Sequence, residues 1–446
     1  MIVLALAILP VAMALIVLLL HSLRTVAALV STATLVAVGV LAATLGESET
    51  VVILGRSVGL SAQGSAALAF CAILLALMVL YTYGVSGDSR LFPLTLAGMG
   101  FFAGAMMVST MAIAVLLLEA GVVMAVMLVP SRHVGSPMAG SRILVLLVLS
   151  ASLLLLASWA IEGGAGDSDD AQLVRMGCVA LAIAGGLLLG IVPFHVWLPP
   201  VFRHASPLAA VMLSVVLGVS VLVHFESVSR GAISSGGNEF FSTLLLAGGI
   251  ATAIVAGLIA TVQRAISRAV AYAALADFGV VLVGLGIGTQ ASTGAATLHL
   301  AYRGIGVATV CMAMGIVGGD DLEHLQGALR RAPLAVIGMI VGGLSVAGLP
   351  LTAGFTTRLA LYRALAANHP GWALAVMACS IGPAWALTRC LVATLVSAPA
   401  PGGRREPLLP GLLALLLSLM LVALGVCPGL LSLLPKEWLG IFGPLG

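Results

Sequence analysis

Long runs of apolar residues, separated by short polar segments, follow one another along the whole 446-residue chain. A helix needs about 20 predominantly apolar residues to cross the hydrocarbon core of a bilayer. Fourteen runs come near that length, and each predicts a membrane-spanning helix: 2–20, 25–46, 60–83, 92–109, 111–130, 143–162, 176–193, 207–225, 241–262, 269–288, 296–318, 335–366, 372–393 and 407–430. The pattern therefore predicts an all-α polytopic membrane protein with about 14 transmembrane helices.

The amino-acid composition agrees with this pattern and excludes soluble globular, disordered and secreted disulfide-rich proteins. Hydrophobic residues make up 61% of the chain and charged residues 8%, whereas soluble domains carry about 25% charged residues. The six cysteines form no C-x-x-C pair, so neither an iron–sulfur cluster nor a disulfide framework is indicated. The net charge of +3 is too small to suggest a nucleic-acid partner. The first apolar run lacks a basic n-region, and we interpret it as a span, not a removed signal peptide.

Basic residues are distributed unevenly between the two ends of the predicted spans. Eleven arginines follow odd-numbered spans, namely Arg24, Arg90, Arg132, Arg142, Arg203, Arg264, Arg268, Arg330, Arg331, Arg404 and Arg405. Four basic residues follow even-numbered spans, namely Arg56, Arg175, Arg230 and Lys436. Because basic loops stay in the cytoplasm, we expect a multi-pass protein of a prokaryotic inner membrane with both termini on the outer side. Lys436 is the only lysine, which disfavours any function that needs a buried, titrating lysine.

The seventh and twelfth spans contain glycine and proline clusters typical of broken membrane helices. Span 7 ends in Gly190 and Pro193, and span 12 contains Gly348, Pro350 and Gly354. Paired breaks in two halves of a transporter point to an ion path between inverted repeats. The separation of five spans predicts two inverted five-helix repeats, spans 4–8 and 9–13, with ordinary kinks as the alternative. Composition does not shift along the chain, so we expect a single membrane domain, 1–446, with four parts: 1–109 (N-terminal helices 1–4), 110–230 (first repeat core), 241–393 (second repeat) and 407–446 (C-terminal helix and tail).

Ionisable residues inside the spans are the candidate functional sites, because a charge near mid-membrane is costly and usually serves a function. They are Glu119 in span 5, Asp277 in span 10, His299 and Arg303 in span 11, Arg358 after the break in span 12, Arg389 late in span 13, His224 at the end of span 8 and His195 in the loop PFHVWLP. Arg389 and His224 lie near enough to span ends to reach the membrane interface instead. His195 is equally consistent with a structural role, in which it only forms a hydrogen bond in a packed loop. A structural role is also the alternative to a functional one for Asp277 and His299.

No catalytic centre emerges from the sequence. We find no metal-ligand cluster, no phosphate-binding or dinucleotide-binding glycine loop after a strand, and no nucleophile–base pattern. We therefore expect no metal and no cofactor bound by this chain. The chemistry that the sequence offers is the movement of protons or ions.

Three ordered motifs resemble a known family. They are GIVPFHVWLPPVFRHASPLAAVML, VQRAISRAVAYAALADFGVVLVGLG and LQGALRRAPLAVIGMIVGGLSVAGLPLTAGFTTRLAL. They are similar to the signatures of the antiporter-like membrane subunits shared by complex I (NADH:quinone oxidoreductase), Mrp-type cation/proton antiporters and membrane-bound energy-converting hydrogenases. The similarity extends over roughly residues 110 to 365.

The resemblance implies a proton-translocating module. In such subunits a glutamate of span 5 pairs with a lysine of span 7, and buried lysines or histidines continue the path to a charged residue in broken span 12. Glu119 matches that glutamate, and His299 and Arg303 match the two histidines of a His-x-x-x-His-x-x-x-Lys face. Arg358 takes the place of the span-12 lysine.

The chain departs from this pattern at several positions. Leu188 stands at the span-7 lysine position and Val307 at the span-11 lysine position, and residues 216–220 contain no base. Glu119 then lacks its usual cationic partner, and a lone buried carboxylate is more stable neutral than charged. Hydroxyl groups are the remaining candidates to bridge the gaps: Thr309, Ser345 and Thr352.

We therefore expect an antiporter-like subunit of a redox-linked complex, complex I-like or hydrogenase-like, that contributes to or descends from proton translocation. The resemblance implies that it is a subunit of an oxidoreductase of the quinone reductase or hydrogenase type. Its implied partners are other membrane-arm subunits, a peripheral redox arm that carries the quinone, iron–sulfur and nickel–iron centres, and lipids, with no nucleic acid. The alternatives are a stand-alone cation/proton antiporter or bicarbonate-uptake component, and a non-pumping structural spacer.

Overall fold

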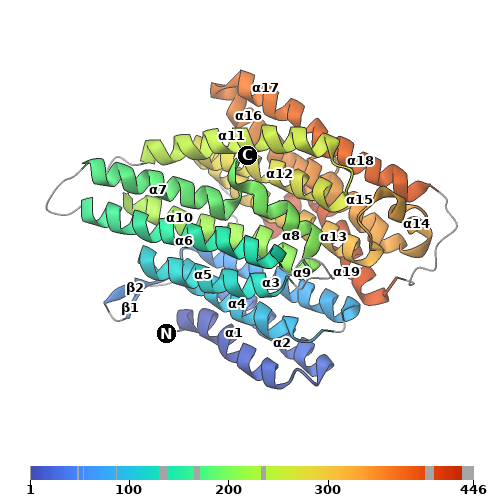
Figure 1. Ribbon diagram of the computed structural model, residues 1–446, viewed down its shortest axis with the longest axis horizontal. Coiled ribbons are helices and arrows are strands. Elements are labelled where there is room, and N and C mark those ends of the chain that lie inside the picture. The colour runs from blue at the N-terminus through green and yellow to red at the C-terminus, as the bar shows by residue number, and fades with distance from the viewer. Residues whose placement is uncertain are drawn as a thin grey trace. The chain divides into compact units, whose positions relative to one another are not determined.

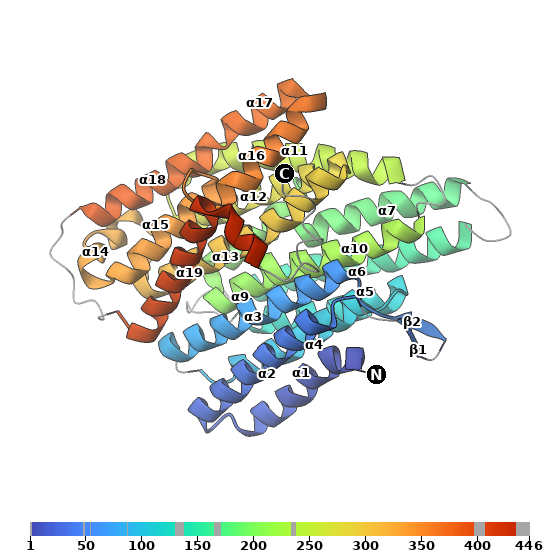
Figure 2. The ribbon, with the colours of Figure 1, turned by 180° about the vertical axis from the view of Figure 1, so that it is seen from behind.

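Nearly all of the apolar sequence folds into helices, because the backbone groups of a membrane segment must find their hydrogen-bond partners within the protein. The computed structural model describes residues 2–47, 50–53, 55–86, 88–129, 138–164, 171–232, 238–396 and 406–433. Contacts within the chain group its residues into two units. Their helices and strands are labelled in Figures 1 and 2. Unit 1 comprises Met1–Val79, Asp88–Trp197 and Met212–Leu244, and unit 2 comprises Leu80–Gly87, Leu198–Val211 and Leu245–Gly446.

Unit 1 contains the N-terminal helices and a short β-hairpin. Its elements are α1 (Ile2–Leu19), α2 (Arg24–Leu45), β1 (Val51–Ile53), β2 (Arg56–Val58), most of α3 (Ala62–Val85), α4 (Leu91–Met107), α5 (Met111–Met127), α6 (Met138–Gly164), α7 (Ala171–Leu189), the 3₁₀ turn η1 (Phe194–Trp197), the π-helical turn η2 (Met212–Val216) and α10 (Leu217–Ala232). The two strands are antiparallel, with Val52 opposite Ser57. Helices α4, α5 and α7 all contact α10.

Unit 2 contains the helices that carry most of the predicted site residues. Its elements are α8 (Leu198–His204), α9 (Pro207–Val211), most of α11 (Asn238–Val262), α12 (Ile266–Ile287), α13 (Gln290–Val317), η4 (Leu322–Leu325), α14 (Ala328–Arg331), α15 (Pro333–Ala347), α16 (Ala353–Asn368), α17 (Pro370–Cys379), α18 (Ile381–Leu395), α19 (Leu408–Val426) and η5 (Pro428–Leu433). Helix α13 contacts α12, α15, α16 and α19, so it is the central helix of this unit.

All fourteen predicted spans coincide with helices. Among the described residues, eleven helical segments are long and apolar enough to cross a membrane, and α4, α5 and α15 are shorter apolar helices. The total of fourteen crossings and the inverted repeats stay predictions. The division of a single domain into four parts also stays a prediction. The two units do not follow that division, because residues 198–211, which belong to the predicted first repeat, have their contacts in unit 2.

Both predicted helix breaks are present. Helix α7 ends at Leu189, and the chain passes through Gly190, which has a φ of +67°, before α8 begins. Helix α15 ends in a Schellman motif, in which the N–H of Gly348 donates to the carbonyl of Ser345 (3.0 Å) and that of Leu349 donates to Leu344 (2.9 Å). Gly348 has a φ of +71°, which glycine adopts without strain.

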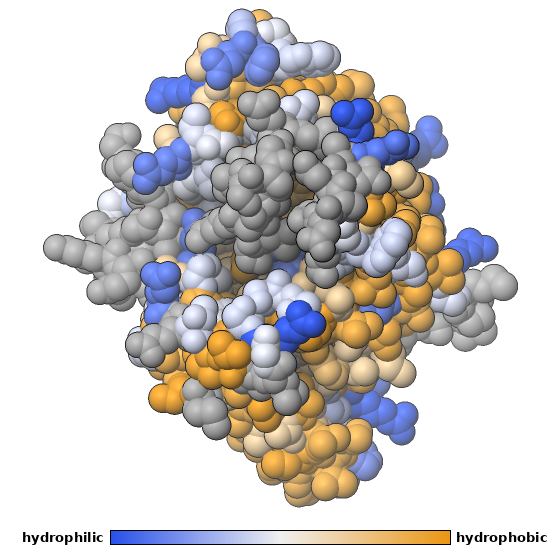
Figure 3. Space-filling model, turned by 90° about the vertical axis from the view of Figure 1, so that its left-hand side faces the viewer, coloured by the Kyte–Doolittle hydropathy of each residue, from blue (hydrophilic) through white to orange (hydrophobic). Residues whose placement is uncertain are grey.

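Burial separates interior helices from outer ones. In the most apolar stretch of α12, 83% of the residues are buried within the protein, whereas 28% are buried in that of α1. Hydrophobic residues, shown in orange, cover broad areas of the face in Figure 3. The exposed large apolar side chains include Leu19, Trp159, Leu374 and Leu419. Such a surface suits contact with lipid tails or with other membrane helices.

Candidate functional site

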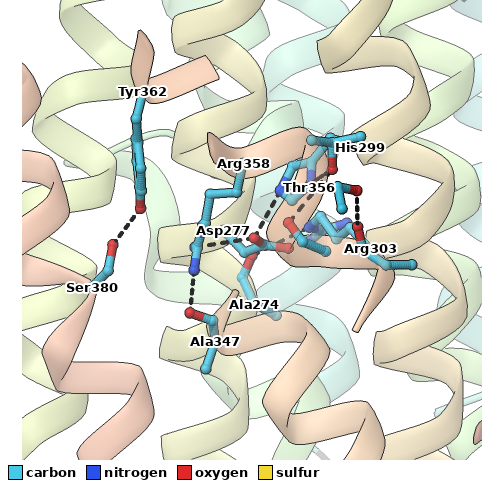
Figure 4. A network of polar contacts seen from close by, with 12 residues as sticks. Ala274, Asp277, His299, Arg303, Ala347, Thr356, Arg358, Tyr362 and Ser380 are labelled. Carbon is cyan, nitrogen blue, oxygen red and sulfur yellow. Dashed lines mark hydrogen bonds and ion pairs between the residues drawn. The ribbon is translucent and has the colours of Figure 1, made fainter. Parts of the chain in front are cut away.

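Three ionisable side chains from three helices meet inside unit 2 (Figure 4). They are Asp277 of α12, His299 of α13 and Arg358 of α16, with exposed fractions of 0%, 0% and 2%. Nε2 of His299 lies 2.9 Å from Oδ1 of Asp277, and Nη2 of Arg358 lies 3.0 Å from the same oxygen. A single carboxylate oxygen therefore joins the three helices.

The break between α15 and α16 brings Arg358 to this carboxylate. A Cβ atom at Gly354 would collide with the carbonyl oxygen of Ser345, so the first turn of α16 lies directly against the end of α15. From there the Arg358 side chain reaches back, and its Nη1 donates to the carbonyl of Ala347 at the C-terminus of α15. A cation at this position is favoured by the helix dipole and satisfies a carbonyl that the broken helix leaves unpaired.

Thr357 completes the contacts of His299. Its Oγ1 lies 2.8 Å from Nδ1 of the ring and 3.5 Å from the carbonyl oxygen of Gly354. Thr357 is itself 5% exposed. Both ring nitrogens of His299 thus have a polar partner in a fully buried position.

Arg303 lies one turn after His299 on α13 and is 3% exposed. Its Nε donates to the carbonyl of Ala274 (3.3 Å), and its guanidinium carbon is 4.9 Å from the centroid of the Phe278 ring. This cation–π contact and the backbone acceptor stabilise a charge that would otherwise be costly inside the protein.

The arrangement can store and rearrange protons, but only on some of its members. Histidine changes its charge near neutral pH, whereas an arginine keeps its proton. In this cluster Asp277 and His299 are therefore the groups able to exchange a proton, and Arg358 and Arg303 act as permanent charges.

Comparison with known proteins identifies the kind of chain that carries this cluster. A family model described as the transmembrane region of NADH:quinone oxidoreductase and Mrp antiporter subunits matches residues 165–382, which include all four residues of the cluster. The matched residues, just under half of this chain, are similar to the family of antiporter-like membrane subunits.

Individual relatives agree with that assignment. The chain is 28% identical over 257 residues to NADH-quinone oxidoreductase subunit N of Rhodospirillum rubrum, a match that covers 54% of this chain and 52% of that subunit. It is 32% identical over 201 residues to formate hydrogenlyase subunit 3 of Escherichia coli, covering 41% of this chain and 32% of that one. The match thus spans about half of the length of the first of these relatives and about a third of the second.

A solved structure supports the fold over the full length. A chain of the Mrp complex from Dietzia sp. DQ12-45-1b superposes with a TM-score of 0.85 at 17% sequence identity, covering 99% of this chain and 98% of that one. The antiporter-like fold therefore extends beyond the region matched by sequence.

Other site residues predicted for this antiporter-like subunit lie apart from the cluster in the chain. Glu119 is half-buried on α5 in unit 1, and its Oε1 has no hydrogen-bond partner among the described residues. His195 is half-buried in η1, also in unit 1, next to the exposed Pro193 of the first break. Pro350 is exposed in the second break. Lys436 lies outside the described residues.

The two positions where the resemblance implies lost lysines are buried. Leu188 of α7 is 3% exposed and Val307 of α13 is 0% exposed. Neither side chain can carry a proton, so a path through these points would need water or other side chains.

Two residues predicted near span ends have different surroundings. Arg389 of α18 donates from Nη2 to the carbonyls of Thr261 (2.9 Å) and Gln263 (2.8 Å), and so caps the C-terminus of α11. The expectation that His224 reaches the membrane interface is wrong. Helix α10 continues past it to Ala232, and the side chain is 1% exposed.

The three hydroxyl groups predicted to bridge the gaps form no hydrogen bond with His299 among the described residues, and their bridging role stays a prediction. Thr309 and Thr352 donate to carbonyls of their own segments, Ile305 and Leu349, and Oγ of Ser345 has no partner among the described residues. The hydroxyl that contacts His299 belongs to Thr357. Its position beside Arg358, one turn after the break, was the signal available in the sequence.

Proposed function

We propose that this chain is a membrane-arm subunit of a redox-linked, proton-translocating complex of the complex I or hydrogenase type. The two curated relatives named above carry the names of subunits of such enzymes. Because the matches cover half of those subunits or less, the case for the activity depends mainly on the site itself.

The observation that carries the proposal is the buried cluster of Asp277, His299 and Arg358. A buried ion pair contributes little net stability compared with well-packed apolar residues, and ionisable groups at membrane depth usually belong to an ion path or a proton relay. A histidine held between a carboxylate and a hydroxyl is able to gain and release a proton where it stands. We infer that proton movement through unit 2 involves His299.

The route proposed for this chain differs from the one that the family resemblance implies. Leu188 and Val307 stand where that resemblance puts lysines, and Arg358 cannot lose its proton. In our proposal the titrating positions are reduced to Glu119 in unit 1 and to Asp277 and His299 in unit 2. The arginines set the electrostatic potential around them.

The proposed partners and location follow from this role. We expect neighbouring membrane-arm subunits, lipids and a peripheral arm that holds the quinone, iron–sulfur or nickel–iron centres. We also expect the chain in a prokaryotic cytoplasmic membrane with both termini outside. This chain would itself hold no redox centre. Among its described residues, no group of three or more His, Cys, Asp or Glu side chains could hold a metal ion.

The test is the ratio of protons to electrons in the purified complex that contains this chain, reconstituted into vesicles. His299→Gln keeps a polar side chain but removes the titrating ring, and we expect it to lower the ratio while electron transfer continues. Glu119→Gln tests the site in unit 1 in the same assay. His369→Gln is the matched control, because His369 is exposed at the end of α16.

A non-pumping spacer is the second candidate, and the buried apolar Leu188 and Val307 favour it. It predicts an unchanged proton-to-electron ratio in both His299→Gln and Glu119→Gln. Purification of the chain from its native membrane with antiporter subunits and without redox subunits would instead indicate a cation/proton antiporter or a bicarbonate-uptake component.

A further inference from the structure

We propose that Thr357 is a positioning residue that allows His299 to exist in two protonation states without repacking, by turning its hydroxyl between Nδ1 of His299 and the carbonyl of Gly354. This inference rests on the proposed role of His299 in proton movement. It assigns to Thr357 a role in that site that neither composition nor motif indicated.

The contacts define the neutral state of the ring. The Arg358 guanidinium, 3.0 Å from Oδ1 of Asp277, favours the ionised carboxylate. A carboxylate only accepts hydrogen bonds, so the proton between it and His299 belongs to Nε2, at 2.9 Å. In a neutral ring Nδ1 is then an acceptor, and the Thr357 hydroxyl donates to it across 2.8 Å.

The same atoms accommodate the protonated state. When Nδ1 takes up one proton it becomes a donor, and Oγ1 of Thr357 must accept from it. The hydroxyl hydrogen of Thr357 then turns to the carbonyl oxygen of Gly354, 3.5 Å away. One proton is added to the ring, no covalent bond of Thr357 breaks, and both ring nitrogens keep a partner in each state.

The Gly354 carbonyl is held in place by the helix break. Only glycine fits at this position, because a Cβ atom would collide with the carbonyl oxygen of Ser345 at the end of α15. A carbonyl oxygen has two lone pairs and can accept a second hydrogen bond while it serves the helix. The acceptor for the Thr357 hydroxyl is thus fixed by the contact of α16 with α15.

The charged groups around His299 come from a few elements. Asp277 faces it from α12, Arg358 from α16, and Arg303 lies on α13 itself. Three other helices that contact α13, namely α9, α15 and α19, contain no ionisable residue. Helix α3 contributes Tyr81, whose hydroxyl donates to the carbonyl of Met312, farther along α13 from His299. The hydrogen bond observed at Nδ1 is with the hydroxyl of Thr357, so this hydroxyl is the group that distinguishes the two states.

The experiment compares Thr357→Val, Thr357→Ser and the control Thr356→Val in the reconstituted complex. Valine keeps the shape of threonine and removes the hydroxyl, and serine restores it. The hydroxyl of the neighbouring Thr356 donates to Ala353, so its loss leaves His299 untouched. Two quantities are measured in each variant: the proton-to-electron ratio, and the ¹⁵N resonance of Nδ1 in His299 across a pH series.

We expect Thr357→Val to lower proton translocation by roughly tenfold or more, a factor that corresponds to one charge-assisted hydrogen bond. The Nδ1 resonance should shift toward that of a nitrogen without a hydrogen bond. Thr357→Ser and Thr356→Val should match the unmodified complex in both measurements. Thermal unfolding of each variant shows whether the complex is intact.

Three results would overturn the inference: an unmoved Nδ1 resonance in Thr357→Val, normal translocation in that variant when His299→Gln abolishes it, or a defect in Thr357→Ser equal to that in Thr357→Val. Failure of the proposed function has a different signature. In that case His299→Gln and Thr357→Val both translocate normally, while the Nδ1 resonance still reports the hydroxyl contact.

Discussion

One carboxylate oxygen, Oδ1 of Asp277, accepts from His299 and pairs with Arg358, while Oδ2 has no hydrogen-bond partner among the described residues. Transfer of these groups from water to the interior costs several kcal/mol for each ion, and their mutual attraction offsets it only when the contacts are intact. The cluster is therefore sensitive to the loss of any single charge.

Asp277→Asn removes the negative charge and leaves Arg358 without its counter-ion. We expect the protein to lose about 3–5 kcal/mol of stability, the usual effect of breaking a buried ion pair from one side. Thermal unfolding in detergent measures this loss. Asp321→Asn is the control, since Asp321 is exposed and its side chain does not cap η4. Equal unfolding temperatures for the two variants would contradict the prediction.

At the scale of elements, the break between α15 and α16 organises the site. The Schellman motif ends α15 at the point where Arg358 from α16 can reach its last carbonyls. The break therefore ends α15 and also places the Arg358 cation against the carbonyl groups at its C-terminus. A straight helix through residues 333–368 would satisfy its own carbonyls and leave Arg358 no such acceptor.

Gly348→Ala should disturb this element in two ways. Alanine at a φ of +71° costs about 1–2 kcal/mol, and its Cβ would also collide with the side chain of Arg358. Gly288→Ala separates the two effects, because Gly288 ends α12 with a φ of +72° and a Cβ atom there would meet no neighbouring atom within 4 Å.

We expect both glycine variants to unfold at lower temperature, with the larger decrease for Gly348→Ala. Only Gly348→Ala should also alter proton translocation in the reconstituted complex, because it displaces Arg358 from Asp277. The same decrease in both variants, with translocation unaffected, would show that Arg358 moves aside without consequence.

At the scale of the whole molecule, buried charge is distributed unevenly between the two units. Unit 2 contains Asp277, His299, Arg303 and Arg358 at exposed fractions of 0–3%, whereas in unit 1 His224 of α10 is 1% exposed and Leu188 of α7 is apolar. If the subunit moves protons, we expect substitutions of ionisable residues in unit 2 to lower proton translocation more than substitutions in unit 1.

The orientation predicted from the arginine distribution can be tested with single cysteines in a cysteine-free chain. Ser22→Cys lies after α1 and Glu47→Cys after α2, and both positions are exposed. We expect a membrane-impermeant maleimide to label Glu47→Cys in intact cells and Ser22→Cys only after the membrane is opened. The reverse pattern would place the N-terminus in the cytoplasm.

The sequence alone determined that this is a polytopic helical membrane protein with helix breaks near Gly190 and Gly348. Length and apolarity decide that much, because a backbone in lipid must satisfy its own hydrogen bonds. The sequence also identified Asp277, His299 and Arg358 as candidates, since ionisable residues stand out in an apolar chain. It could not indicate which of them meet.

Only the tertiary structure decided the partners: Asp277 with His299 and Arg358, Thr357 with His299, and Arg389 with the end of α11. In a soluble protein the polar face of a helix shows which side is turned outward. In a membrane helix the lipid-facing side and the protein-facing side are both apolar, so the pattern contains little information on rotation or neighbours. The contacts that give this chain its chemistry are therefore set by packing between helices far apart in the sequence.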